Sequence, residues 1–297
     1  MITFENKIIT SVVNKLLTGK NYRTDILNYI NIQFLDFSIQ FFKDILQAKL
    51  NNNDINLDWY KTTFITNNKL SNVDIVNNAG INLKTLTNLC GSTKKEIVLN
   101  IAETNYDYLK NLINELNEDN IENNNENINI QIKIEYNKIS VELNLAESLL
   151  VINALATKKI SLRGGAWSAI GKNVEKPLML KLCKLCKVNS ENINSEVFKR
   201  DKNLKVDREV DFKLYSDNKA KEYRCEIKLS GKGNPESYDA VVARNTDIFI
   251  ADAISEQAKN HLDSLNIKWL ELKNKQQKDI IKDFKIILED LEIPFSN

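Results

Sequence analysis

The sequence has very little histidine, with one residue of this type in a chain of 297. Metal centres built from several histidines are excluded on that ground, and so are nucleases whose catalysis depends on histidine. Carboxylate and amine side chains are therefore the remaining candidates for catalysis or metal binding.

Cysteine is also sparse, and four cysteines suit a reducing compartment. Cys183 and Cys186 form a C-x-x-C pair, but a structural zinc site needs two further ligands. Only His261, Cys90 and Cys225 remain to supply them. Both members of the pair lie in the apolar helical run LMLKLCKLCKV, which favours core packing over metal binding.

Long hydrophobic segments are missing as well. The N-terminal MITFENKIITSVVNKLL has acidic and asparagine residues where the apolar centre of a signal peptide would lie. No run of about 18 apolar residues occurs, so no membrane-spanning segment is predicted. We therefore expect a cytoplasmic protein.

Nucleotide-binding loops are missing too. The segment GAWSAIGKN, residues 165–173, has glycine and lysine in the wrong spacing for a phosphate loop. A Walker A motif here needs glycine in place of Ala166, and serine or threonine in place of Asn173. No Rossmann glycine fingerprint follows any predicted strand, so we expect no nucleotide cofactor.

Charge is unevenly distributed, although the net charge of the chain is only +1. Residues 1–157 hold 14 Lys and Arg against 18 Asp and Glu, which leaves 27 basic and 22 acidic residues for the rest. Within residues 158–188, the single acid Glu175 accompanies eight bases: Lys158, Lys159, Arg163, Lys172, Lys176, Lys181, Lys184 and Lys187. Such a run suits contacts with phosphates of nucleic acid, although a solvated helix face is the alternative.

The segment from Asp207 to Leu229 predicts two half-buried strands joined by a polar turn. Apolar residues alternate with polar ones on both sides of the turn SDNKAK, which is centred between Asn218 and Lys219. The apolar members are Val210, Phe212, Leu214, Tyr223, Cys225, Ile227 and Leu229.

A regular hairpin about this centre places Asp211 directly opposite Glu226. Cross-strand neighbours have Cβ atoms about 4.5–5.5 Å apart, and like charges at that distance repel unless a cation lies between them. Lys228 points to the same face. This face therefore offers two oxygen ligands for a hard metal ion and one ammonium group.

The pattern Asp…Glu-x-Lys resembles the active site of the PD-(D/E)XK nuclease superfamily, with Asp211, Glu226 and Lys228 as the matching residues. Val210 stands where the motif usually has proline. In many of these enzymes a helical glutamate before the first core strand joins the metal cluster, and Glu175 is the residue that would match.

A plainer interpretation is open for both features. The strand face could carry ordinary ion pairs in contact with solvent. Glu175 could be a capping or surface acid beside Lys172 and Lys176.

Residues 1–157 predict a mainly helical domain, which acts either as a scaffold or in dimerisation or an embrace of DNA. Its predicted elements are helices over 4–18 and 25–50, a helix opened by a capping box at Thr93 and Glu96 and ending near 116, an exposed loop over 117–129, a β-hairpin over 128–143 and a buried helix over 146–157.

Residues 158–297 predict the catalytic domain. A Gly-Gly turn leads into a helix that starts or bends at Pro177 and ends near Val188. After the hairpin come a buried strand over 247–253, a helix from Ser255, a strand over 267–272 and a final amphipathic helix. This order matches the αβββαβ core of the superfamily. The expected fold class is α/β (α+β), with a PD-(D/E)XK restriction-endonuclease-like core.

A closer resemblance rests on RGGAWSAIGKNVEKPLM, REVDF and YRCEIKLSGKGNPES, followed by a buried strand and a helix. Over about residues 158–272 the chain is similar to type II restriction endonucleases, and within them to the CfrBI-like family. The resemblance implies Mg²⁺-dependent cleavage of double-stranded DNA at short symmetric sites, commonly by a homodimer.

The same resemblance implies roles for individual residues. Asp211, Glu226 and the main-chain carbonyl of Ile227 would bind Mg²⁺, Glu175 would join them, and Lys228 would lie near the attacking water. The candidates for contacts with DNA are Arg163, Lys172, Lys232, Asn234 and Arg244.

Two other functions remain open. A nuclease of the same superfamily could act in repair, junction resolution or transposition, and would cut by structure instead of by sequence. A non-catalytic DNA-binding or scaffold protein would use the same carboxylates only in ion pairs.

Overall fold

The computed structural model describes residues 4–81, 86–87, 90–122, 131–195, 210, 212–229, 241 and 244–296. Helices and a small sheet make up an α+β protein, as predicted. The chain forms two compact units, which we call the helical unit (residues 27–168) and the sheet unit (residues 1–26 and 169–297).

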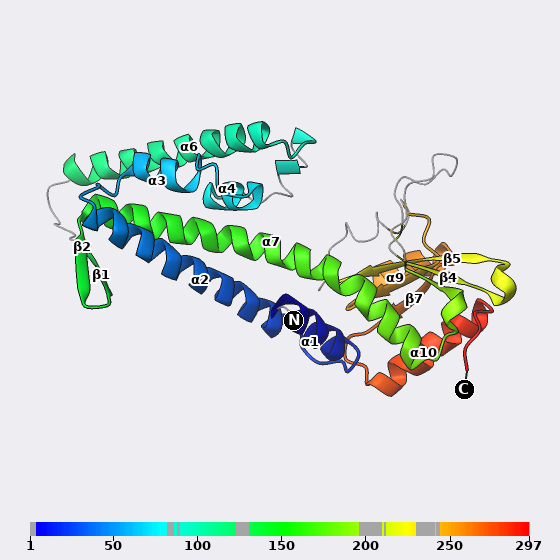
Figure 1. Ribbon diagram of the computed structural model, residues 1–297. Coiled ribbons are helices and arrows are strands. Elements are labelled where there is room, and N and C mark those ends of the chain that lie inside the picture. The colour runs from blue at the N-terminus through cyan, green and yellow to red at the C-terminus, as the bar shows by residue number, and fades with distance from the viewer. Residues whose placement is uncertain are drawn as a thin grey trace. The chain divides into compact units, whose positions relative to one another are not determined.

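The helical unit consists of helices and one β-hairpin (Figure 1). Its elements are most of α2 (Arg23–Leu50), α3 (Leu57–Phe64), α4 (Asn72–Asn78), α6 (Lys95–Glu122), β1 (Ile132–Tyr136), β2 (Ile139–Leu143) and the first part of α7 (Leu145–Leu185). Within the unit, α2 and α7 run side by side, joined by an ion pair of 2.5 Å between Lys49 Nζ and Glu147 Oε1.

Aromatic packing forms the core of the helical unit. The ring of Phe41 on α2 is 1% exposed and contacts the rings of Phe37, Tyr60 and Phe64. Asn78 is buried beside them, where its side chain donates to Phe64 O and accepts from Lys158 Nζ. These polar groups satisfy one another, so their burial is compatible with a stable core.

The described residues of the sheet unit form five strands in the order β3-β4-β5-β6-β7. Its elements are α1 (Phe4–Leu16), the end of α7, β3 (Ile193–Asn194), β4 (Phe212–Tyr215), β5 (Glu222–Lys228), β6 (Ile248–Ala251), α9 (Glu256–Ser264), β7 (Lys268–Glu271) and α10 (Gln277–Asp290). The pairs β3–β4 and β4–β5 are antiparallel, whereas the pairs β5–β6 and β6–β7 are parallel.

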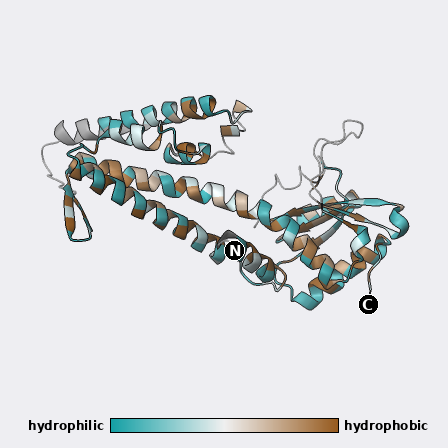
Figure 2. Cartoon of the chain, viewed as in Figure 1, coloured by the Kyte–Doolittle hydropathy of each residue, from teal (hydrophilic) through white to brown (hydrophobic). Residues whose placement is uncertain are grey.

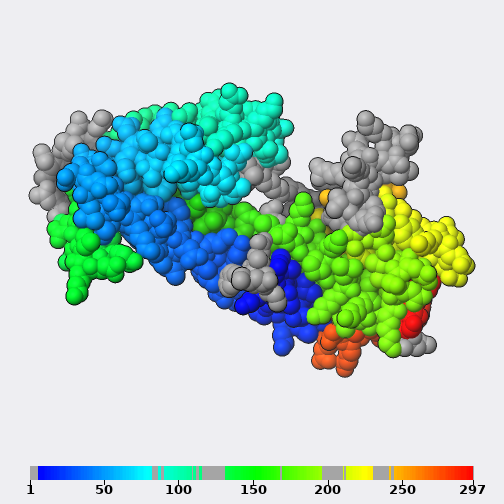
Figure 3. All heavy atoms as spheres, viewed as in Figure 1, coloured from blue at the N-terminus to red at the C-terminus, as the bar shows by residue number. Residues whose placement is uncertain are grey.

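The predicted hairpin is present, and its register is as predicted at all four described pairs. Phe212 pairs with Cys225 and Tyr215 with Glu222, and the turn centre at Asn218 and Lys219 has positive φ at both residues. Figure 3 shows this turn, in yellow, at the surface of the unit.

The prediction that both strands are half-buried is wrong for β5. Its residues from Arg224 to Ile227 are all buried, polar ones included. The reason is its central place in the sheet, since a strand with neighbours on both edges and parallel pairing is covered on both faces.

The later elements follow the prediction closely. Strands β6 and β7 and helices α9 and α10 lie within the predicted ranges. Ser255 caps α9, and its side chain accepts from Ala258 N. All four residues of β6 are buried, as a strand between two parallel neighbours requires.

The prediction of a Gly-Gly turn before a helix is wrong. Helix α7 continues through Gly164, Gly165 and Pro177 for 41 residues, and absorbs the predicted helix over 146–157. Glycine costs about 1 kcal/mol and proline about 3 kcal/mol in a helix interior. Tertiary packing outweighs this, because four side chains around the proline are fully buried: Val174, Leu178, Met179 and Leu182.

In the helical unit, the predicted hairpin is confirmed, and its turn has positive φ at Asn137 and Lys138. The predicted loop over 117–129 is wrong in its first part, because α6 extends to Glu122. The rest of that segment lies outside the described residues.

The two compact units differ from the predicted division at 157/158. That boundary falls inside α7, and residues 1–26 belong with the sheet unit. A side chain on α1 accounts for part of this, since Asn14 accepts from Lys181 on α7. Separate roles for an N-terminal and a catalytic domain stay a prediction.

Within the described residues, every helix is too short or too polar to cross a membrane. Figure 2 shows hydrophilic and hydrophobic residues mixed along α2 and α7, the two helices that run side by side in the helical unit.

Candidate active site

Three charged side chains follow one face of β5. Arg224, Glu226 and Lys228 alternate with apolar residues, and period two directs them to the same side of the sheet. The central position of the strand buries Glu226 completely and leaves Lys228 near the carboxyl end of the strand. Asp211, which the prediction places opposite Glu226, lies outside the described residues.

The carboxylate of Glu226 is held by two cations through the same oxygen. Oε1 lies 2.5 Å from Lys228 Nζ and also contacts Arg244 Nη1. The other oxygen, Oε2, is buried and has no hydrogen-bond partner within the described part of the chain. A buried carboxylate oxygen in that state is suited to a ligand that brings positive charge.

Glu175 joins this group from α7. Its Oε1 lies 3.0 Å from Lys228 Nζ, and its side chain is 11% exposed. Lys228 therefore links a strand carboxylate with a helix carboxylate 53 residues earlier in the chain. The structure thus brings together three of the four predicted catalytic residues, Glu175, Glu226 and Lys228.

The pKa of Lys228 is raised above its ordinary value. Burial lowers it, but the carboxylates of Glu226 and Glu175 together outweigh this effect and favour the charged ammonium. The stabilising effect of this charge is fully present below pH 10.5, the ordinary pKa of lysine, and is lost as the pH rises through the higher folded-state value.

Arg224 is hydrogen-bonded to the turn that contains Arg244. Its Nε donates to Arg244 O at 2.8 Å, and its backbone N donates to Asp247 Oδ2 at 2.7 Å. Arg224 is 5% exposed, so this contact is fixed by packing. The period of two in β5 places Arg224 on the same strand face as Glu226, but no pattern in the sequence indicates this hydrogen bond, because its acceptor lies 20 residues away.

The carboxylates among the described residues are of the type that binds a hard divalent cation, but they are too few for a complete site. Glu226 and Glu175 offer carboxylate oxygens, which Mg²⁺ prefers. No group of three His, Cys, Asp or Glu suited to a metal ion occurs among residues with a described position. A third carboxylate would have to come from Asp211, beyond those positions, and Ile227 lies between Glu226 and Lys228 with a buried side chain.

The residues predicted to contact DNA lie in different environments. Arg163 and Lys172 are exposed on α7. Arg244 contacts Glu226, an environment that the prediction did not include. Lys232 and Asn234 lie outside the described residues.

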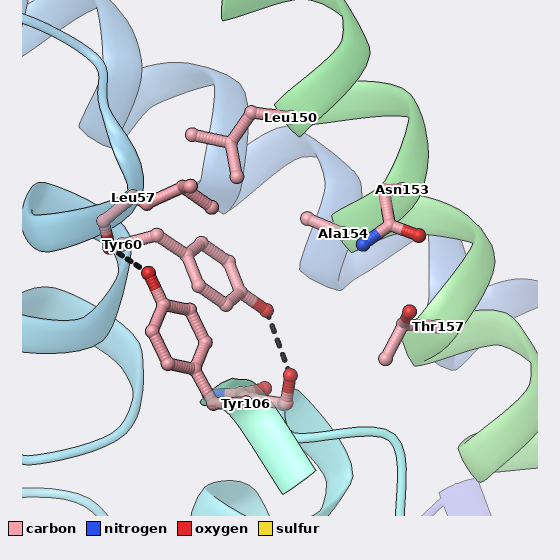
Figure 4. A pocket seen from close by; sticks show the side chains of 8 residues that line it. Leu57, Tyr60, Tyr106, Leu150, Asn153, Ala154 and Thr157 are labelled. Atoms are coloured by element: carbon pink, nitrogen blue, oxygen red, sulfur yellow. Dashed lines mark hydrogen bonds between the residues drawn. The ribbon is translucent and has the colours of Figure 1, made fainter. Parts of the chain in front are cut away.

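Two further features, a buried cysteine pair and a small cavity in the helical unit, are unsuited to metal-assisted hydrolysis. Cys183 and Cys186 are fully buried, as core packing predicts, and burial raises the pKa of Cys183 to about 12. In the helical unit, Tyr60 and Tyr106 border a cavity of about 10 Å³, with Tyr60 donating to Asn78 O (Figure 4). A volume of that size holds at most one water molecule.

A family model described as CfrBI restriction endonuclease matches residues 6–259. No match was found among the curated proteins or the solved structures. The match includes Glu175, Glu226, Lys228 and Arg244, and it extends into the helices that precede the segment on which the resemblance rests. The chain therefore belongs to the CfrBI restriction endonuclease family, a family of nucleases that bind DNA.

Proposed function

We propose that the protein is a cytoplasmic type II restriction endonuclease that makes site-specific double-strand cuts in DNA with Mg²⁺. The observation that carries this proposal is the cluster of Glu175, Glu226 and Lys228 in a chain that belongs to a restriction endonuclease family. A strand carboxylate, a helix carboxylate and an ammonium in contact with one another suit phosphodiester hydrolysis, because they can hold a divalent cation beside a group that stabilises negative charge.

In this proposal Asp211, Glu226 and the main-chain carbonyl of Ile227 hold Mg²⁺, with Glu175 beside them. Support comes from the buried Oε2 of Glu226, which has no hydrogen-bond partner within the described residues. When bound, Mg²⁺ lowers the pKa of a water molecule and offsets negative charge on the phosphate.

The protein groups have separate roles. Lys228 orients the attacking water or donates to the phosphate oxygens as charge develops on them. Arg244 and Lys228 hold Oε1 of Glu226, so that Oε2 is the oxygen left for the cation. Arg224 is a positioning residue, since it acts on Glu226 through its hydrogen bond to the turn at Arg244.

Plasmid digestion tests the proposal. Incubation of the full-length protein with plasmid DNA and Mg²⁺ should give discrete fragments, and EDTA should prevent cleavage. A smear, or cleavage only at branched structures, would favour repair or junction resolution over restriction. Absence of metal-dependent cleavage on several plasmids of different sequence would favour a non-catalytic DNA-binding protein.

A further inference from the structure

A polar cavity lies in the sheet unit, at the carboxyl ends of β6 and β7. It has a volume of about 310 Å³. Its walls come from the connection between α1 and α2 and from the residues that directly follow the two strands. The lining residues used below are Lys20, Tyr22, Arg23, Asp252 and Lys273.

The floor of this cavity is built from buried groups. Tyr22 OH donates to Asp252 Oδ2 at 2.7 Å, and both residues are about 95% buried, with 6% and 5% exposed. Burial, and then the nearby carboxylate of Asp252, raise the pKa of Tyr22, so the phenol remains a hydrogen-bond donor.

The wall on the α1–α2 side is held closely against the chain that leads into α10. Gly19 has φ +62°, and a Cβ atom there would lie 2.3 Å from Lys275 O. Only glycine allows this approach of the two backbones. An ion pair of 2.6 Å between Lys15 and Asp25 also fixes the start of α2 to α1.

The rim of the cavity is positively charged. Lys20, Arg23 and Lys273 line it and are exposed. Asp252 is the one carboxylate among the lining residues, and it already accepts from Tyr22. Three exposed cations around a buried polar floor are suited to an anion with several oxygens, as a phosphate group has.

The cavity lies on the same edge of the sheet as the candidate active site. Asp252 N donates to Lys228 O at 3.3 Å, and Lys273 N donates to Asp252 O at 2.9 Å. Lys228, Asp252 and Lys273 are therefore successive neighbours across the carboxyl ends of three parallel strands. A DNA strand cut beside Lys228 would have its neighbouring phosphates along this edge.

We propose that this cavity binds backbone phosphates of the DNA substrate beside the cut site, through Lys20, Arg23 and Lys273. The inference rests on the proposed function for the nature of the ligand. It adds a second DNA contact surface, formed in part by residues 20–23, far in sequence from the catalytic residues.

The salt dependence of DNA binding tests the proposal. Binding of the full-length protein to a duplex of mixed sequence is measured in EDTA, which prevents metal-dependent cleavage, at several NaCl concentrations. Each phosphate contact contributes about 0.9 to the slope of log K against log salt. The variant Lys20→Ala/Arg23→Ala/Lys273→Ala should have a slope shallower by up to about 2.7 than wild type.

A matched control removes the same charge elsewhere in the sheet unit. Lys221, Lys278 and Lys282 are exposed, in the β4–β5 turn and on α10, and do not line the cavity. Their triple alanine variant should keep most of the wild-type slope. Thermal melting should be close to wild type for both variants, because all six side chains are exposed.

Two outcomes would overturn the assignment of the cavity, and a third would overturn the proposed function. Equal slopes for the cavity variant and its control would overturn the assignment of the cavity. An unchanged slope, together with saturable binding of inorganic phosphate that the cavity variant loses, would make the ligand a free anion and also overturn it. Failure of wild type to bind any duplex would instead overturn the proposed function itself.

Discussion

Two cations contact one oxygen of Glu226, and this residue-scale arrangement determines how the candidate site responds to substitution. Lys228 and Arg244 both contact Oε1 of this fully buried carboxylate. Removing one partner of a buried ion pair leaves the other incompletely compensated, which costs more than an exposed ion pair contributes. Substitutions here should therefore change stability as well as activity.

Lys228→Ala should lower the cleavage rate at least 100-fold, which corresponds to about 2.7 kcal/mol of transition-state stabilisation. It should also lower the free energy of unfolding by about 1.5–3 kcal/mol, because Glu226 and Glu175 lose a charged donor. Plasmid cleavage rates and urea unfolding measure the two effects.

Lys213→Ala is the matched control for this substitution. Lys213 lies on the neighbouring strand β4, has a side chain 12% exposed, and pairs with Glu222 at 2.8 Å. The control should lose an ion pair and keep cleavage. Less than a tenfold loss of cleavage in Lys228→Ala would exclude Lys228 as a catalytic residue.

Metal binding by Asp211 and Glu226 should be measurable without cleavage. Wild type should melt at a higher temperature with Ca²⁺ and uncleaved duplex than in EDTA, because a ligand of the folded state stabilises it. Asp211→Asn and Glu226→Gln should both lose this increase.

In EDTA the two variants should differ from each other. Glu226→Gln should melt below wild type, because Lys228 and Arg244 lose their carboxylate partner. Asp211→Asn should melt no lower than wild type, since it removes a predicted repulsion. A large decrease for Asp211→Asn would identify that aspartate as a structural ion-pair partner instead of a metal ligand.

At the scale of elements, β5 supports the turn over residues 244–247 as well as carrying site residues. Arg224 donates to Arg244 O, and Asp247 N donates back to Arg224 O at 2.8 Å. The strand therefore fixes both the carboxylate of Glu226 and Arg244, one of the two cations that contact it.

Arg224→Met should lower the free energy of unfolding by about 1.5–3 kcal/mol, through loss of a charged hydrogen bond to Arg244 O. It should also reduce the stabilisation by Ca²⁺ and duplex, since Glu226 is less well oriented. Calorimetric melting with and without Ca²⁺ measures both effects, and the exposed Lys278→Met on α10 is the control. Full retention of the Ca²⁺ effect would show that Arg224 acts only on stability.

At the scale of the whole molecule, cutting both strands of a symmetric site requires two active sites related by a two-fold axis. Among its described residues, the chain carries one candidate active site, which lies in the sheet unit. On α2, the apolar side chains of Ile32, Leu35 and Ile39 follow helical spacing on one face, with 39%, 57% and 46% exposed. We predict that a second copy of the chain covers this face, because the proposed reaction needs two active sites.

We expect two protein chains for each uncleaved duplex in light scattering, against 34.1 kDa for one chain. Leu35→Glu should weaken this assembly at least tenfold, because a buried charge in an apolar contact is costly. Ile286→Glu on α10, where the side chain is 47% exposed, is the control and should leave it intact. A complex of one chain with one duplex would exclude a symmetric double-strand cut by a homodimer.

The local pattern of the sequence was sufficient for much of the fold. Period-two alternation and the polar turn predicted the β4–β5 hairpin together with its register, because both depend on residues close in the chain. The serine cap of α9 and the helical spacing of α1 and α2 are local in the same sense. The placement of Glu226 and Lys228 on one strand face follows from this register alone.

The path of α7 shows where local pattern was insufficient. Gly164, Gly165 and Pro177 predict a turn and a break, yet the helix continues through them. Local propensity contributes only a few kcal/mol, and burial of the apolar side chains near Pro177 outweighs it. The extent of that burial depends on the sheet against which the helix packs.

The sequence by itself determined which residue types are available for catalysis, and it placed two of them on one strand. The tertiary structure decided their partners: Glu175 reaches Lys228 across 53 residues, Arg244 reaches Glu226 across 18, and Tyr22 reaches Asp252 across 230. Such contacts form only when distant segments meet in the folded core. No periodicity records them, because periodicity reflects the neighbours of a residue within its own helix or strand.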